Sequence, residues 1–96
     1  MNPTQTKIIN QVDENAIVDL ASELIKIPSF KLEETPVANF LADFFNERGY
    51  KVDLQEVEPG RFQTIASLEG TGGGQSLMLN GHTDINSLTR RWRRDP

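Results

Sequence analysis

Residues 76–80 hold a short apolar run, Leu77-Met78-Leu79, between a serine and an asparagine, and this run constrains the fold more than any other feature. Continuous apolar runs of this length are typical of strands buried on both faces, as in sheets that helices cover from both sides. A chain with such a strand must also provide helices and neighbouring strands around it. The run therefore predicts a layered α/β domain.

The spacing of apolar residues predicts a first helix from Glu14 to about Ile27. Asp13 is suited to cap its start, and Pro28 ends it because the residue before a proline disfavours the helical conformation. The apolar positions follow the helical period, and we expect them to pack in a core: Ile17, Leu20, Ala21, Leu24 and Ile25. Residues 1–12, which precede this helix, are expected to be a flexible leader.

A second helix is predicted between Thr35 and Gly49. Thr35 suits the cap position, Pro36 the first helical position, and Gly49 the left-handed residue after the end. The apolar stripe of this helix contains large side chains and is expected to be buried: Val37, Phe40, Leu41, Phe44 and Phe45.

Strands are predicted after the second helix. Residues 50–55 alternate apolar and polar side chains, which indicates a strand with one solvated face, and residues 64–69 form the next strand beyond a Pro59-Gly60 turn. The glycine-rich stretch 70–74 lacks the Lys-Ser/Thr pair of a phosphate-binding loop, so it is interpreted as a hairpin turn. Two helices followed by about three strands match the opening of an α/β domain, here covering residues 13–96.

Composition excludes some classes of site. The chain contains no cysteine, which excludes disulfides and thiolate metal sites, and no apolar run reaches the roughly 20 residues that span a bilayer. The first residues do not resemble a secretory signal, so we expect a cytoplasmic protein. A basic segment, Arg90 to Arg94, is interpreted as a solvated loop or as a partner-binding patch. With only Trp92 for base stacking, we expect no nucleic acid as a partner. Because no apolar run is long enough to span a bilayer, we also expect no membrane as a partner.

The candidate site is Gly81-His82-Thr83-Asp84, directly after the apolar run. Functional residues of α/β sheets gather where the chain leaves the carboxyl ends of strands. His82 is the one histidine of the chain, and imidazole is a common zinc ligand whose second ring nitrogen often donates to a carboxylate. Asp84 is the nearest residue for that orienting role. A lone histidine is also common on ordinary surfaces, so the spacing by itself leaves a structural role open.

Neighbouring motifs favour the metal-binding interpretation. Gly81 to Asp84 is followed by Trp92-Arg93-Arg94-Asp95-Pro96. This pairing resembles a signature of the zinc-dependent amidohydrolase and exopeptidase family that includes acetylornithine deacetylase, succinyl-diaminopimelate desuccinylase, aminoacylase and the glutamate carboxypeptidases. Ile27-Pro28-Ser29 and Gly49-Tyr50 also resemble patterns of that family, so the resemblance covers residues 16–96.

The resemblance implies a dinuclear zinc hydrolase, with cobalt as a possible replacement, that cleaves N-acyl amino acids or small peptides. In the family, the residue matching His82 ligates one metal and the residue matching Asp84 orients that imidazole. A glutamate deprotonates a water that attacks the amide carbonyl. The resemblance also implies a zinc-peptidase catalytic domain and a homodimeric full-length enzyme.

Two departures from the family pattern stand out. Ser87 occupies a position where the family often has proline. In addition, the bridging aspartate, the paired glutamates, a further acidic ligand and a final histidine have no counterpart in these 96 residues. We therefore expect the chain to be an amino-terminal fragment of the catalytic domain and inactive by itself. The alternative is a small non-catalytic binding module that uses Arg90 to Arg94.

Overall fold

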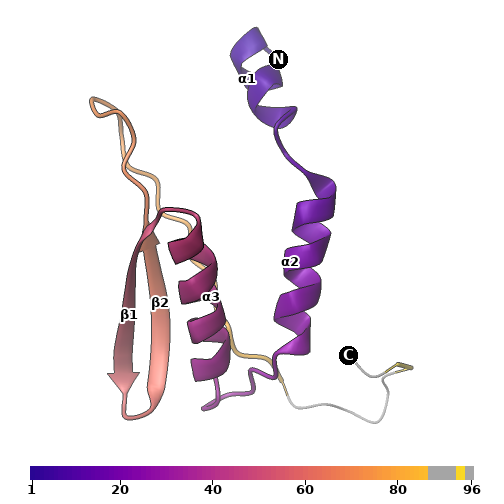
Figure 1. The fold of residues 1–96 in the computed structure, drawn as a ribbon, viewed down its shortest axis with the longest axis vertical. Coiled ribbons are helices and arrows are strands. Elements are labelled where there is room, and N and C mark those ends of the chain that lie inside the picture. The colour runs from indigo at the N-terminus through magenta and orange to yellow at the C-terminus, as the bar shows by residue number, and fades with distance from the viewer. Residues whose placement is uncertain (87–92, 95–96) are drawn as a thin grey trace.

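The computed structural model describes residues 1–86 and 93–94. Three helices are followed by a two-stranded sheet: α1 (Pro3–Ile9), α2 (Glu14–Lys26), α3 (Thr35–Glu47), β1 (Lys51–Glu58) and β2 (Arg61–Ser67) (Figure 1). These elements are consistent with part of an α/β domain. The one sheet of the described residues has two strands, so the layered zinc-peptidase domain is not confirmed and stays a prediction.

Helix α3 lies along one face of the β1–β2 hairpin, and this contact forms the compact part of the structure (Figure 1). Val37 and Ala38 of α3 are the buried apolar side chains there. The hydroxyl of Thr64 on β2 donates a hydrogen bond of 2.6 Å to the carbonyl oxygen of Ala38. Leu54, the partner of Thr64 in the antiparallel register, lies on the same face of the sheet. The predicted burial of the apolar stripe of α3 is confirmed for Val37. It is confirmed only in part for the aromatic residues of the stripe, which are half-buried.

Both strands of the hairpin were predicted, with different ends. The strand predicted for residues 50–55 extends to Glu58, and the strand predicted for residues 64–69 begins earlier, at Arg61. Gly60 has a φ of 77°, a left-handed conformation that glycine adopts without steric cost and that allows the tight turn. A register shift between Glu56 and Glu58 precedes the turn.

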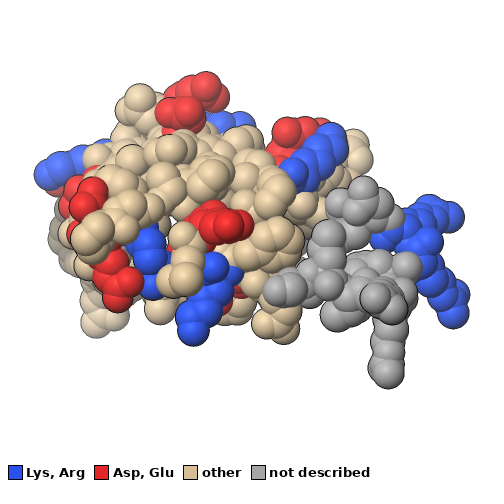
Figure 2. Space-filling view, turned by 90° about the horizontal axis from the view of Figure 1, so that it is seen from below, with Lys and Arg blue, Asp and Glu red and all other residues tan. Residues whose placement is uncertain are grey.

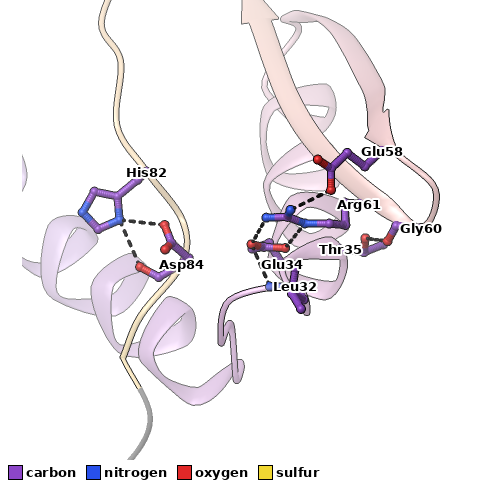
Figure 3. Close-up of polar contacts among 8 residues, drawn as sticks. All are labelled: Leu32, Glu34, Thr35, Glu58, Gly60, Arg61, His82 and Asp84. Carbon is purple, nitrogen blue, oxygen red and sulfur yellow. Dashed lines mark hydrogen bonds and ion pairs between the residues drawn. The ribbon is translucent and has the colours of Figure 1, made fainter.

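A cluster of three charged residues joins the start of α3 to this hairpin turn. We call Glu34, Glu58 and Arg61 the Glu34 clamp (Figure 3). Arg61 donates from Nη2 to Glu34 Oε1 at 2.8 Å and from Nε to Glu34 Oε2 at 3.3 Å, and its Nη1 donates to Glu58 Oε2 at 2.9 Å. Planar two-point pairing of this kind is among the strong charge-assisted hydrogen bonds. Because Glu34 is buried, removal of Arg61 would leave a carboxylate without its charged partner.

The predicted cap of α3 was wrong by one residue. Thr35 is the first helical residue, and Glu34 occupies the cap position without a side-chain cap hydrogen bond. The Glu34 carboxylate instead accepts from the backbone N–H of Leu32 at 3.1 Å and from Arg61. The Thr35 hydroxyl donates to the carbonyl oxygen of Gly60 at 2.7 Å, so a tertiary contact replaces the local cap. At the other end, Gly49 has the predicted left-handed φ, 81°.

Helix α2 begins and ends close to the predicted residues, but its apolar face is not buried. Asp13 caps it by accepting from the backbone N–H groups of Asn15 and Ala16, and it ends at Lys26, just before Ile27-Pro28. The expectation of core packing is met only in part: Leu20 and Leu24 are half-buried, whereas Ile17, Ala21 and Ile25 are exposed. Amphipathic periodicity indicates which face can be buried and does not provide the partner.

Residues 1–12 contain a helix in place of the loose segment expected there. Asn2 and Gln5 form a reciprocal capping box, in which each side chain accepts from the other residue's backbone N–H. Pro3 follows at the start of the helix, where its missing N–H costs nothing. These local signals stabilise α1, although all its residues are exposed.

The strand predicted at residues 76–80 was wrong. Leu77, Met78 and Leu79 are in no helix or strand and are 84%, 87% and 86% exposed. A strand forms when its backbone pairs with a neighbouring strand, and this segment pairs with neither β1 nor β2. The glycine-rich stretch before it forms bends, with positive φ at Gly72 and Gly73, rather than a hairpin turn between two strands.

None of the helices in the described part of the chain is both long and apolar enough to cross a membrane.

We expect acid to destabilise the fold through the Glu34 clamp. Hydrogen bonds from Arg61 hold the pKa of Glu34 at about 2, below its ordinary value of 4.5, although burial opposes this shift. A carboxyl with a depressed pKa contributes stability that is fully present above pH 4.5 and is lost as the pH falls from 4.5 through about 2. Glu34→Gln should therefore lower the urea midpoint at neutral pH and flatten its decline below pH 4.5. Glu33→Gln, at the exposed neighbouring residue, is the matched control. If the urea midpoints of the wild type and of Glu34→Gln fell in parallel as the pH is lowered, the stabilising role of Glu34 would be contradicted.

The small core also allows a paired test. Val37 is 4% exposed and Val57 is 62% exposed. Val37→Ala shortens a buried side chain by two carbon atoms and should lower the free energy of unfolding by about 1.5 kcal/mol. Val57→Ala should change it by less than about 0.5 kcal/mol, as surface substitutions usually do. Equal losses for the two variants in urea titrations would show that α3 does not pack on the hairpin as described.

Candidate metal centre

His82 and Asp84 lie side by side in a segment that is in neither a helix nor a strand (Figure 3). The Nδ1 atom of His82 is 3.0 Å from the backbone oxygen of Asp84 and 3.3 Å from its carboxylate Oδ1. Both of these atoms are acceptors, so Nδ1 is the donor and carries a proton. The second ring nitrogen, Nε2, then holds the free lone pair that a metal ion needs. His82 is 84% exposed, so this nitrogen is open to a ligand.

The segment that carries this pair is attached to the loop after α2. The backbone N–H of Ile85 donates to the carbonyl oxygen of Ser29 at 2.9 Å, and Phe30 and Ile85 form an isolated parallel bridge. Ser29 is buried at this junction. The contact brings together two sequence patterns more than 50 residues apart, Ile27-Pro28-Ser29 and Gly81 to Asp84. This contact was not among the predictions; the signal that could have indicated it is that both patterns resemble the same family.

The loop from Ser29 to Glu34 also connects this junction to the Glu34 clamp. Within it, Leu32 has a φ of 79°, which is costly for a residue with a side chain. Its backbone N–H donates to Glu34, and the backbone N–H of Glu33 donates to the carbonyl oxygen of Phe30 at 2.8 Å. These bonds fix the loop between the Glu34 clamp and the segment that contains His82.

The described residues contain one imidazole that could ligate a metal ion, His82, and a carboxylate in contact with it, Asp84. In residues 1–86 and 93–94, no three or more histidine, aspartate or glutamate side chains gather in a way that could hold a metal ion. The carboxylates of the Glu34 clamp are already paired with Arg61. A catalytic zinc site needs about three protein ligands and an open position. His82 and Asp84 therefore fit one ligand of such a site and its partner.

Several residues of the sequence predictions lie outside the described residues: Ser87, Arg90, Arg91, Trp92, Asp95 and Pro96. Arg93 and Arg94 are described and exposed. The second half of the family signature and most of the basic segment thus stay predictions. Over the rest of the face shown in Figure 2, acidic and basic side chains are interspersed and form no patch of a single sign.

Comparisons with known proteins identify relatives of this chain. It is 39% identical over 71 residues to acetylornithine deacetylase of Vibrio campbellii (strain ATCC BAA-1116), a match of 72% of the chain and 18% of that protein. It is 35% identical over 91 residues to acetylornithine deacetylase of Shigella sonnei (strain Ss046), covering 82% of the chain and 23% of that protein. It is 29% identical over 102 residues to N-formyl-4-amino-5-aminomethyl-2-methylpyrimidine deformylase of Bacillus subtilis (strain 168), covering 96% of the chain and 23% of that protein.

The chain thus spans about a fifth of the length of the curated relatives it matches. No family model matches its sequence, and no solved structure matches it. The resemblance recognised in the motifs and the relatives found by comparison agree on one group of amide hydrolases.

The geometry of His82 predicts its tautomer. In the neutral ring, we expect the proton on Nδ1, because both atoms near Nδ1 accept hydrogen bonds. A proton–nitrogen correlation spectrum of the imidazole at alkaline pH distinguishes the two tautomers. Asp84→Ala should lower the Nδ1–H population, since only the backbone acceptor remains, whereas Asp43→Ala on α3 should leave it unchanged. A ring protonated mainly on Nε2 in the wild-type protein would contradict the arrangement.

Proposed function

Because the chain is a homologue of the amide hydrolases that include acetylornithine deacetylase, we propose that it carries part of the active site of a metal-dependent hydrolase. The observation that carries the proposal is the His82–Asp84 pair, in which Nδ1 donates toward Asp84 and the imidazole side chain is 84% exposed. Metal-ligating histidines usually have this arrangement, with the second ring nitrogen donating to a carboxylate or a carbonyl oxygen. Asp84 offers both kinds of acceptor.

The proposed reaction is removal of a small acyl group from an amine nitrogen. The relatives are named as a deacetylase of acetylornithine and a deformylase of an N-formyl aminopyrimidine. Both names describe the removal of a one- or two-carbon acyl group from a nitrogen atom. For this protein we propose N-acyl amino acids or small peptides as substrates, with acetyl, formyl or succinyl as the acyl group. Such a substrate is a small molecule, and we place the reaction in the cytoplasm.

In this proposal His82 is a zinc ligand through Nε2, and cobalt is an alternative metal. Asp84 is a positioning residue that fixes the ring orientation and keeps the proton on Nδ1. Zinc, when bound in such a site, lowers the pKa of a water molecule and polarises the amide carbonyl. The hydrogen bond from Ile85 to Ser29 holds the segment that presents the imidazole. The family resemblance further implies two metal ions per site and a homodimeric full-length enzyme.

We propose that these 96 residues do not hydrolyse amides by themselves. The chain has one histidine and no cysteine, and the carboxylates of its described residues do not gather into a three-ligand group. One imidazole is too few ligands for a catalytic zinc site. In this proposal, activity requires further metal ligands from outside these 96 residues.

The complete gene product tests this proposal through two measurements, its zinc content and its hydrolysis of acetylornithine. His82→Ala should lose both. Asp84→Ala should weaken zinc binding by roughly 10–100-fold, as loss of an orienting partner typically does. Asp43→Asn, an exposed carboxylate on α3, is the matched control and should retain zinc and activity. A His82→Ala protein with its full zinc content and rate would refute the role of His82, and parallel assays with formyl, acetyl and succinyl substrates would identify the acyl group.

A further inference from the structure

The segment just before His82 has features that the proposed hydrolase function does not use. Asn80 is followed directly by Gly81, and both residues are exposed and lie in neither a helix nor a strand. In the part of the chain that the structure describes, neither the Asn80 amide nor the Gly81 backbone N–H takes part in a hydrogen bond. A Cβ atom at Gly81 would meet nothing within 4 Å, so the space around this backbone is open.

We propose that Asn80 is a site of spontaneous deamidation. The backbone nitrogen of Gly81 attacks the Cγ atom of the Asn80 side chain and loses its proton as the new C–N bond forms. The bond from Cγ to the side-chain nitrogen breaks, ammonia leaves with the proton, and a five-membered succinimide results. Water then opens this ring at either carbonyl, which gives aspartate or isoaspartate. The net change consumes one water, releases one ammonia, and requires no other reactant.

The structure favours Asn80 over the other asparagines. Glycine has no side chain to hinder the approach of its nitrogen to Cγ, and it allows the backbone rotation that the ring closure needs. Asn2 is held by its hydrogen bonds with Gln5 in the capping box of α1. Three others lie inside helices, where the backbone is fixed and the next residue carries a side chain: Asn15, Asn39 and Asn46. Asn10 and Asn86 also precede residues with a side chain, Gln11 and Ser87.

Deamidation would alter the candidate metal centre. Isoaspartate inserts one methylene group into the main chain two residues before His82, and either product adds a negative charge there. The segment is fixed on the other side by the hydrogen bond from Ile85 to Ser29, so the extra atom displaces the imidazole. This consequence rests on the proposed function, whereas the modification itself does not. Loss of zinc on ageing is the expected result.

The modification is tested by ageing the purified protein at mildly alkaline pH and digesting it with trypsin. The tryptic peptide 62–90 contains Asn80 and Asn86, which fragmentation in the mass spectrometer distinguishes, and the peptide 32–48 contains Asn39 and Asn46 of α3. Peptide 62–90 should gain about one dalton at Asn80, with isoaspartate detectable by enzymatic methylation, while peptide 32–48 should not change. Gly81→Ala should slow the gain several-fold, and Asn80→Gln should abolish it. Equal rates in both peptides, or an unchanged rate in Gly81→Ala, would overturn the proposal.

Zinc content separates the two proposals. Fresh complete protein that binds zinc through His82 supports the proposed function, and fresh protein without zinc refutes that function while the mass measurement still decides the modification. If the fresh protein binds zinc, aged wild type should lose it in proportion to the isoaspartate formed, and aged Asn80→Gln should keep it. Full zinc content in extensively modified protein would overturn the inferred displacement of His82.

Discussion

The paired hydrogen bonds between Arg61 and Glu34 hold the compact part of this structure together. They join residues 27 positions apart and connect the first turn of α3 to the turn of the β1–β2 hairpin. The apolar core between these elements is small, with Val37 and Ala38 as its buried members, so burial alone gives limited stability. Two-point pairing also fixes orientation, because the guanidinium and the carboxylate are both planar. Thr35 and Gly60 add a further hydrogen bond across the same junction.

The same interaction extends toward the candidate metal centre through backbone hydrogen bonds. Glu34 accepts from Leu32, whose strained left-handed conformation needs such a partner, and the loop then runs back to Ser29. Ser29 accepts from Ile85, which directly follows Asp84. The His82–Asp84 contact itself is local, since the residues are two positions apart, but its place relative to α2 and α3 depends on this loop.

Two apolar surfaces stay uncovered in the described residues: the face of α2 that contains Ile17 and Ile25, and the segment Leu77-Met78-Leu79. Both have the sequence pattern of buried elements, and they occur in a chain that spans about a fifth of its curated relatives. A helix face and a buried strand acquire their structure from what packs on them. Within the described residues, the outer edges of β1 and β2 stay unpaired, and neither of these two apolar surfaces packs against the sheet.

The sequence by itself determined the local features of this protein. The start of α2 at Asp13, the left-handed residue Gly49 after α3, the hairpin at Pro59-Gly60 and the approach of His82 to Asp84 all depend on groups within a few residues of one another. Capping, turn geometry and short-range hydrogen bonds are energetically local, so sequence patterns predict them. The helix α1 was also local, and its Asn2–Gln5 capping box was the overlooked signal. Only the tertiary structure decided that the Glu34 carboxylate accepts from Arg61 instead of capping its own helix. The same holds for the hydrogen bond from Ile85 to Ser29 and for the lack of a strand at residues 76–80. These outcomes depend on which distant groups are present to pair, and a pattern along one segment carries no information about the availability of its partner.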